Sequence, residues 1–143
     1  MRYDDLLKSG RIRREKISRA EIDQFLERAA RDLKTARMII AADLDWGFAV
    51  AYNAVLQASR AYMFAQGYRP ASAEGHKNTF AFMRLAMGKD HEDLILYFDR
   101  MRNKRNQAIY GAAGLVTETE ARYLLGKATE FLKLIRGRLS GTM

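Results

Sequence analysis

Several residue types are scarce in this 143-residue chain, and each scarcity excludes a class of structure. The absence of cysteine excludes disulfides and thiolate metal sites, and it suits a reducing cytoplasm. With a single proline, little interrupts long helices. The longest apolar runs, such as 38–42 and 47–52, fall far short of the ~20 residues that a membrane-spanning helix needs. We therefore expect a cytoplasmic protein with no membrane segment.

The sequence motifs of common nucleotide-binding and hydrolytic sites are also missing. There is no GxGxxG, no GxxxxGK[ST] and no GxSxG. Histidine occurs only at His76 and His91, and neither is spaced with carboxylates as metal ligands usually are. We interpret His76 as the polar end of an apolar helical stripe and His91 as a surface residue. The sequence predicts no metal and no cofactor.

Positive charge is in excess, with a formal net charge of +8 that favours polyanionic partners such as nucleic acid, nucleotides or an acidic protein. One group of cations occupies 8–19, where the only carboxylate is Glu15. A second group lies in 100–105. Ordinary solvated side chains explain the first group equally well. The second is harder to explain in that way, because one of its charges lies on an apolar face.

Apolar residues recur with the period of an α-helix through most of the chain. This pattern predicts an all-α fold, an antiparallel four-helix bundle with an additional short helix. We expect a short helix at 3–8 and a basic link within 1–17, the bundle in 18–139, and a frayed tail at 140–143. The expected bundle helices cover 18–42, 46–66, 76–87, about 90–111 and 117–139.

Helix starts and the core can also be placed from the sequence. Ser18 with Glu21, and Thr117 with Glu120, have the spacing of capping boxes. Asp45 and Asp90 are the expected N-caps of two other helices. Small residues in 46–66 predict a central helix, because they let neighbouring helices approach closely. Its aromatic residues are expected in the core, with Tyr52 and Tyr62 needing hydrogen-bond partners there: Trp46, Phe48, Tyr52, Tyr62 and the following Tyr68.

The stretch 94–114 has the most informative pattern. Projected at about 100° per residue, it shows an apolar stripe from Leu94 to Ala112 with Arg105 in the middle. A guanidinium stays charged, so burying it is costly unless it meets an anion or several acceptors. Arg102, Asn106 and Tyr110 follow one another at one-turn intervals, a face suited to phosphate. The alternative is an internal network in which Arg105 caps carbonyls or pairs with a carboxylate.

The order of these features resembles the HEPN domain family, helical bundles found among prokaryotic toxins, defence ribonucleases and nucleotidyltransferase partners. A long helix is followed by the aromatic-then-alanine helix of 49–67 (AVAYNAVLQASRAYMFAQG), a loop with Gly75-His76, and a late helix with an arginine–asparagine pair. Active members of the family have the motif RNxxxH. In this chain Arg105-Asn106 begins that motif, and Tyr110 stands at the histidine position. Starting the motif at Arg102 instead puts Gln107 there.

The resemblance implies a homodimer of toxin–antitoxin or defence type that binds RNA or a nucleotide, with a nucleotidyltransferase-type protein as a possible partner. The implied RNA- or nucleotide-binding residues are Arg102, Arg105, Asn106 and Tyr110, and the implied catalytic pair is Arg105 with Tyr110. A tyrosine, with a pKa of about 10, is a weak acid at neutral pH, and arginine cannot act as a base. We therefore expect catalysis to be weak or lost while binding is kept, unless His76 or a partner residue substitutes in a dimer.

Two alternatives stay open at the level of the sequence. One is a degenerate metal-independent endoribonuclease, in which Arg105 binds phosphate and Tyr110 acts as an acid or as a modification target. The other is a non-catalytic structural or adaptor module, in which Arg105 only holds the bundle or the dimer together. The two differ in whether Arg105 serves a ligand or the fold.

Overall fold

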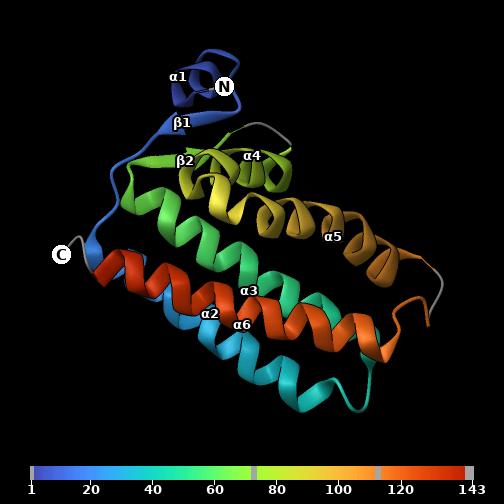
Figure 1. Ribbon diagram of the computed structural model, residues 1–143. Helices are drawn as coiled ribbons and strands as arrows, with labels where there is room; N and C mark the ends of the chain where they lie inside the picture. The colour runs from blue at the N-terminus through green and yellow to red at the C-terminus, as the bar shows by residue number, and fades with distance from the viewer. Residues whose placement is uncertain (1, 72–73, 112–113, 141–143) are drawn as a thin grey trace.

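The computed structural model describes residues 2–71, 74–111 and 114–140 (Figure 1). The four long helices are α2 (Arg19–Ile39), α3 (Leu44–Ala65), α5 (Glu92–Tyr110) and α6 (Glu118–Ser140). Shorter elements complete the described part: α1 (Tyr3–Lys8), β1 (Ile12–Arg14), β2 (Tyr68–Pro70), α4 (Gly75–Met87) and the 3₁₀ turn η1 (Lys89–His91). The predicted all-α helical bundle is confirmed.

Helix α3 lies at the centre of the bundle, with α2 and α6 on one side and α5 on the other (Figure 1). Its small side chains make this possible, and four of them are almost completely buried: Ala51, Ala54, Ala58 and Ala61. Gly47 lies tightly against the end of α2, because an added Cβ atom there would lie 2.8 Å from the Cα atom of Ile40, the residue that caps this helix. The predicted central role of α3 is confirmed, and a side chain at position 47 would push α2 away.

The aromatic residues of this helix are only partly in the core. Phe48 and Tyr52 are buried, whereas Tyr62 is half-buried against the core. The expectation for Trp46 is wrong, because 55% of this residue is exposed. It lies in the first turn of α3, at the end of the bundle.

Two of the four helix starts predicted from the sequence are confirmed, and the predicted N-caps of two other helices are wrong. The amide of Glu21 donates to Ser18 Oγ at 3.2 Å, so Ser18 caps α2 as expected. Asp43 rather than Asp45 caps α3, since it accepts from the amide of Trp46 at 3.0 Å. Asp90 does not cap α5, because 89–91 form the turn η1 and α5 begins at Glu92. Both errors arise because the helical period does not distinguish one aspartate from another nearby, or a 3₁₀ turn from the first turn of a helix.

The second capping box is complete. The amide of Glu120 donates to Thr117 Oγ1 at 3.1 Å, and the amide of Thr117 donates to Glu120 Oε1 at 3.0 Å. Helix α6 then continues to Ser140. The rest of the predicted frayed tail, 141–143, lies outside the described residues.

The basic link contains a strand that the sequence analysis did not predict. Strand β1 pairs antiparallel with β2, with Ile12 opposite Pro70. Ile12 is buried, and with Leu6 of α1 it joins the same apolar cluster as the bundle. Three residues per strand are too few for a recognisable alternation, which explains why the pairing escapes a reading of the sequence. Just before β1, Arg11 donates from its Nε to Asn78 Oδ1 of α4 at 2.9 Å.

Candidate functional site

Three of the four residues implied to bind RNA or a nucleotide line one hollow of about 260 Å³. Helix α5 contributes Arg102, Arg105 and Asn106, and the other wall is the start of α4 with the residue before it: Glu74, Gly75, His76 and Lys77. Of these seven residues, four are basic, histidine included, one is an amide, and Glu74 is the single carboxylate. The structure therefore brings the arginine–asparagine pair of α5 next to a histidine from another helix.

Arg105 is half-buried and packs on an aromatic ring rather than on an acid. Its guanidinium carbon lies 5.8 Å from the centre of the Tyr52 ring, within the range of a cation–π contact. Its Nη1 donates to the side-chain oxygen of the adjacent Asn106 at 3.2 Å. Its Nε is buried without a hydrogen-bond acceptor. Among the described residues no carboxylate forms an ion pair with Arg105, so the charge stays uncompensated within the fold.

Arg102 is held in place by its own helix. Its Nε donates to Asp99 Oδ1 at 3.1 Å, and 25% of the arginine side chain is exposed. Within the described ranges its two Nη groups have no protein partner. Asp99 thus orients the guanidinium and leaves two of its nitrogens for a ligand, which is the arrangement that phosphate recognition uses.

His76 has a role that its place in the sequence did not reveal. Its Nδ1 lies 3.2 Å from the hydroxyl of buried Tyr52, which thereby finds the partner that its burial requires. Desolvation by burial, together with the positive charges of Arg60, Arg105 and Arg102, lowers the pKa of His76 to about 4. Burial also raises the pKa of Tyr52. At neutral pH the site therefore holds a neutral imidazole and a neutral phenol among arginines.

The start of α4 adds backbone donors to these side chains. The amide of Asn78 makes the first bond inside this helix, to the carbonyl of Glu74. The amides of 75–77 precede it and have no partner within the helix. A helix N-terminus also carries partial positive charge, and it is a common place for phosphate to bind. The excess of basic residues over the one carboxylate, and the N-terminus of α4, suit an anion in this hollow.

Tyr110 does not join the hollow. It is the last residue of α5, and 80% of it is exposed. It follows Asn106 by one helical turn, so it stands beside the hollow on the same helix rather than in its wall. The sequence predicted that these side chains follow one another along α5. It did not show that Arg102 and Asn106 line the hollow while Tyr110 lies outside it.

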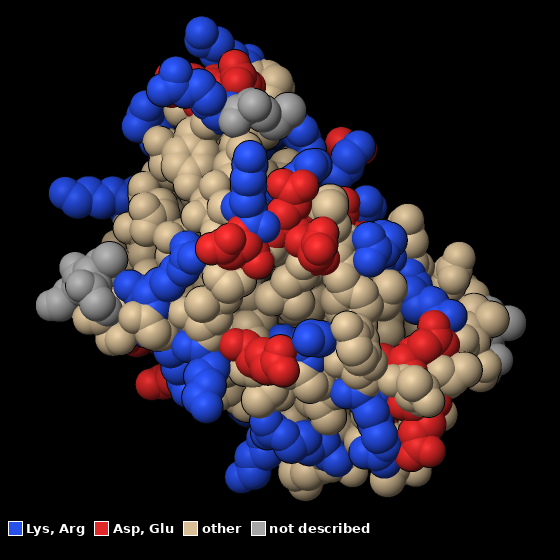
Figure 2. All heavy atoms as spheres, in the orientation of Figure 1, with Lys and Arg blue, Asp and Glu red and all other residues tan. Residues whose placement is uncertain are grey.

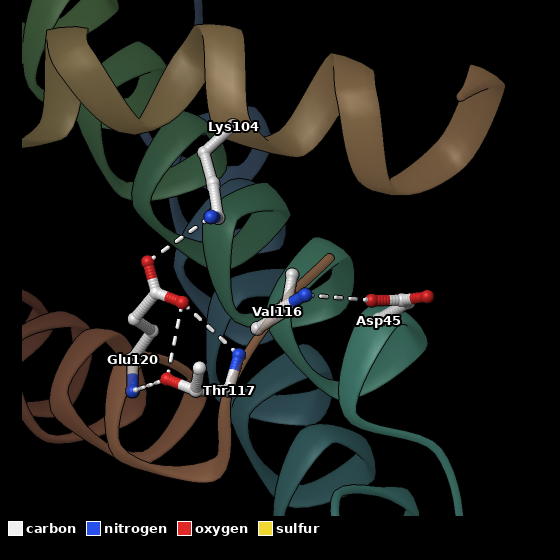
Figure 3. Close-up of polar contacts among 5 residues, drawn as sticks. All are labelled: Asp45, Lys104, Val116, Thr117 and Glu120. Carbon is white, nitrogen blue, oxygen red and sulfur yellow. Dashed lines mark hydrogen bonds and ion pairs between the residues drawn. The ribbon is translucent and has the colours of Figure 1, made fainter. Parts of the chain in front are cut away.

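A network of polar contacts holds the end of α5 against the rest of the bundle (Figure 3). Lys104 of α5 pairs with Glu120 of α6 at 3.1 Å. The hydrogen bond from the Thr117 backbone, followed by Lys104, lowers the pKa of Glu120. Asp45, at the start of α3, accepts from the amides of Gly114 at 2.9 Å and Val116 at 3.3 Å. Lys104 is thereby paired within the fold, in contrast to Arg105.

The cations of 8–19 are partly committed as well. Arg11 donates to Asn78, Arg14 lies over the ring of Tyr68, and Arg19 pairs with Asp23 at 3.0 Å. Figure 2 shows Lys and Arg spread over the visible face with Asp and Glu between them, rather than one continuous basic surface. The distinctive feature of the molecule is therefore the hollow, where arginines meet without a paired acid for Arg105.

Comparison with known proteins agrees with this architecture. No curated protein matches the chain. In the part that the structure describes, no helix is long and apolar enough to cross a membrane, and no three His, Asp or Glu side chains gather as metal ligands. The family model of the HEPN domain matches residues 22–138, which include α3, α4 and α5 with the whole arginine-lined hollow. The chain belongs to the HEPN domain family.

Proposed function

We propose that this protein binds single-stranded RNA or a nucleotide, with Arg102, Arg105 and Asn106 holding a phosphate group and Tyr110 stacking on a neighbouring base. The observation that carries the proposal is the half-buried guanidinium of Arg105, whose Nε has no hydrogen-bond acceptor, beside the N-terminus of α4. Guanidinium groups and helix N-termini both favour phosphate. An exposed tyrosine ring one turn away suits base stacking, which tolerates any sequence.

The test compares the binding of labelled single-stranded RNA by the wild-type protein, by Arg105→Gln and by Arg31→Gln at low ionic strength. Arg31 is an exposed residue of α2, so its replacement removes the same charge at a distance from the hollow. We expect Arg105→Gln to weaken binding about tenfold or more, as for loss of a charged hydrogen bond. The control should bind like the wild type, and binding should weaken with added salt.

The same experiment distinguishes the structural or adaptor module. If Arg105 serves only the fold, Arg105→Gln lowers the melting temperature while the wild-type protein binds no RNA at any salt concentration. That result would refute the proposal. Unchanged melting together with weakened binding supports it.

A second candidate function, a weak metal-independent endoribonuclease, is favoured by the position of His76. RNA cleavage of this kind needs a group that takes the proton of the 2′-hydroxyl, stabilisation of the charged phosphorane, and a proton for the leaving 5′-oxygen. Neutral His76 can accept the proton of the 2′-hydroxyl, Arg102 and Arg105 stabilise the charge, and the phenol of Tyr110 beside the hollow would give its proton to the leaving 5′-oxygen. A base with so low a pKa acts slowly, so weak activity is expected. Cleavage in EDTA that is lost in both His76→Gln and Arg105→Gln would support this candidate, whereas equal cleavage by all three proteins would point to contamination.

Family membership also supports a wider proposal, that the protein is a cytoplasmic homodimer in a toxin–antitoxin or defence system with a nucleotidyltransferase-type partner. The +8 charge favours an RNA target. Expression in a bacterial host tests the role, with growth inhibition by the wild type and none by Arg105→Gln as the expected outcome. Equal growth of the two strains would contradict it.

A further inference from the structure

A second, larger hollow lies in the groove between α4 and α5, directly beside the first. Its volume is about 460 Å³, within the range of pockets that hold small organic ligands. The floor is apolar and comes from both helices: Phe80, Ala81, Leu85, Ile95 and Leu96. Lys77 lines this groove as well as the arginine hollow, so one residue borders both. The two are neighbouring parts of one surface.

Positive charge is in excess around this groove after the ion pairs are taken into account. Glu92 is neutralised by Arg84 at 3.3 Å, and Asp99 by Arg102 at 3.1 Å. The remaining rim charges, Arg11 and Lys77, have no acidic partner among the described residues. The groove therefore combines an apolar floor with uncompensated positive charge, which is the chemistry of a base and a phosphate rather than that of a purely apolar ligand.

Arg11 is built into its position. Its Nε donates to Asn78 Oδ1 at 2.9 Å, and Asn78 is 1% exposed. The amide nitrogen of Asn78 donates in turn to the carbonyl of Ala71 at 2.8 Å. Within the described ranges the two Nη groups of Arg11 have no protein partner. A buried asparagine thus orients a guanidinium over the groove while its outer nitrogens stay available, as Asp99 does for Arg102.

We propose that this groove is a second nucleotide subsite, in which an RNA base lies on the apolar floor and the phosphate next to it binds Arg11 and Lys77. The proposal rests on the function proposed above and extends its ligand from one nucleotide to a short single strand. Along α5 the subsites follow in order, from Leu96 through Arg102 and Arg105 to Tyr110. At about 1.5 Å per residue this path is roughly 20 Å long, enough for several nucleotides.

Two variants and two labelled probes test the groove separately from the arginine hollow. Ala81→Phe fills the floor, and Arg11→Gln removes one rim charge. The probes are a short oligouridylate and the same backbone with abasic ribose units. We expect Ala81→Phe to bind the oligouridylate at least tenfold more weakly and to bind the abasic probe like the wild type. Arg11→Gln should weaken the binding of both probes and reduce the salt dependence of binding by about one phosphate contact.

Arg105→Gln and Arg31→Gln serve as the reference variants. If Arg105→Gln weakens both probes while Ala81→Phe and Arg11→Gln bind like the wild type, the groove proposal falls and the proposed function stands. If the wild-type protein binds neither probe, both fall. If Ala81→Phe weakens the binding of both probes equally, the groove serves packing. If the substitution changes the sedimentation of the protein, the groove is a protein interface. Either result would overturn the proposed subsite. Arg11→Gln decides the matter if Ala81→Phe does not fold.

Discussion

At the scale of single residues, the groups around Arg105 determine what the site can bind. A guanidinium on an apolar face needs compensation, and the sequence left an internal acid and an external anion open. The contact that the structure supplies is the face of Tyr52, which accommodates the charge without neutralising it. An aromatic support of this kind keeps Arg105 ordered and still attractive to phosphate.

The contributions of the Tyr110 ring and of its hydroxyl to RNA binding can be tested separately. Because 80% of it is exposed beside the hollow, stacking needs only the ring. We expect Tyr110→Phe to bind RNA like the wild type, and Tyr110→Ala to lose about 1–3 kcal/mol of binding free energy. Fluorescence anisotropy measures both. Equal losses in the two variants would indicate that the hydroxyl itself contacts the ligand.

His76 predicts a pH dependence of stability. Above pH about 6.5 the imidazole is neutral in both the folded and the unfolded chain, so it contributes nothing. Burial lowers its folded pKa to about 4, and between these values only the unfolded chain takes up the proton. Stability should therefore fall as the pH is lowered through this window. Urea unfolding at pH 7.5 and 5 should show a smaller loss in His76→Gln than in the wild type, and identical losses would exclude the buried neutral imidazole.

At the scale of helices, the close approach of α2 and α3 makes Gly47 sensitive. An added Cβ atom meets both backbone and side chain of Ile40, so overpacking costs about 3 kcal/mol, at the upper end of the usual range. The gain in helix propensity is about 1 kcal/mol. We expect Gly47→Ala to lower the free energy of unfolding by about 2 kcal/mol in urea titrations.

Gly126 of α6 is the matched control for this change. It is exposed, and an added Cβ atom there meets nothing within 4 Å. Gly126→Ala should therefore stabilise the protein by up to about 1 kcal/mol. Stabilisation by both substitutions would show that α2 and α3 separate at little cost.

The helices themselves were predictable because their signals are local and repeated. Periodic apolar residues placed α2, α3 and α6 to within a few residues, and Ser18 and Thr117 marked two of the starts. What escaped prediction depends on contacts distant in sequence. The pairing of β1 with β2 and the meeting of His76 with Arg105 join segments far apart in the chain. Nothing in the periodicity encodes those distances, although the need of buried Tyr52 for a partner was a usable signal.

At the scale of the whole molecule, large apolar side chains are exposed at the end of the bundle where α3 begins and α5 ends. They include Trp46 and Leu115. The proposed homodimer would cover part of such a surface. We expect the wild-type protein to sediment as a dimer and Trp46→Arg to shift it towards the monomer. Gln24→Arg, which adds the same charge at the beginning of α2, should leave the dimer unchanged, and a wild-type monomer at high concentration would contradict the proposal.

The carboxylate of Asp45 has a consequence for how the chain folds. It joins the start of α3 to the amides of Gly114 and Val116, which lie 69 and 71 residues further along the chain. Closing so long a loop costs entropy that is recovered only after the helices between them have docked. We therefore expect this link to form late, after the transition state for folding. A contact of this kind should slow unfolding while contributing little to the speed of folding, and it ties the segment before α6 to the start of α3.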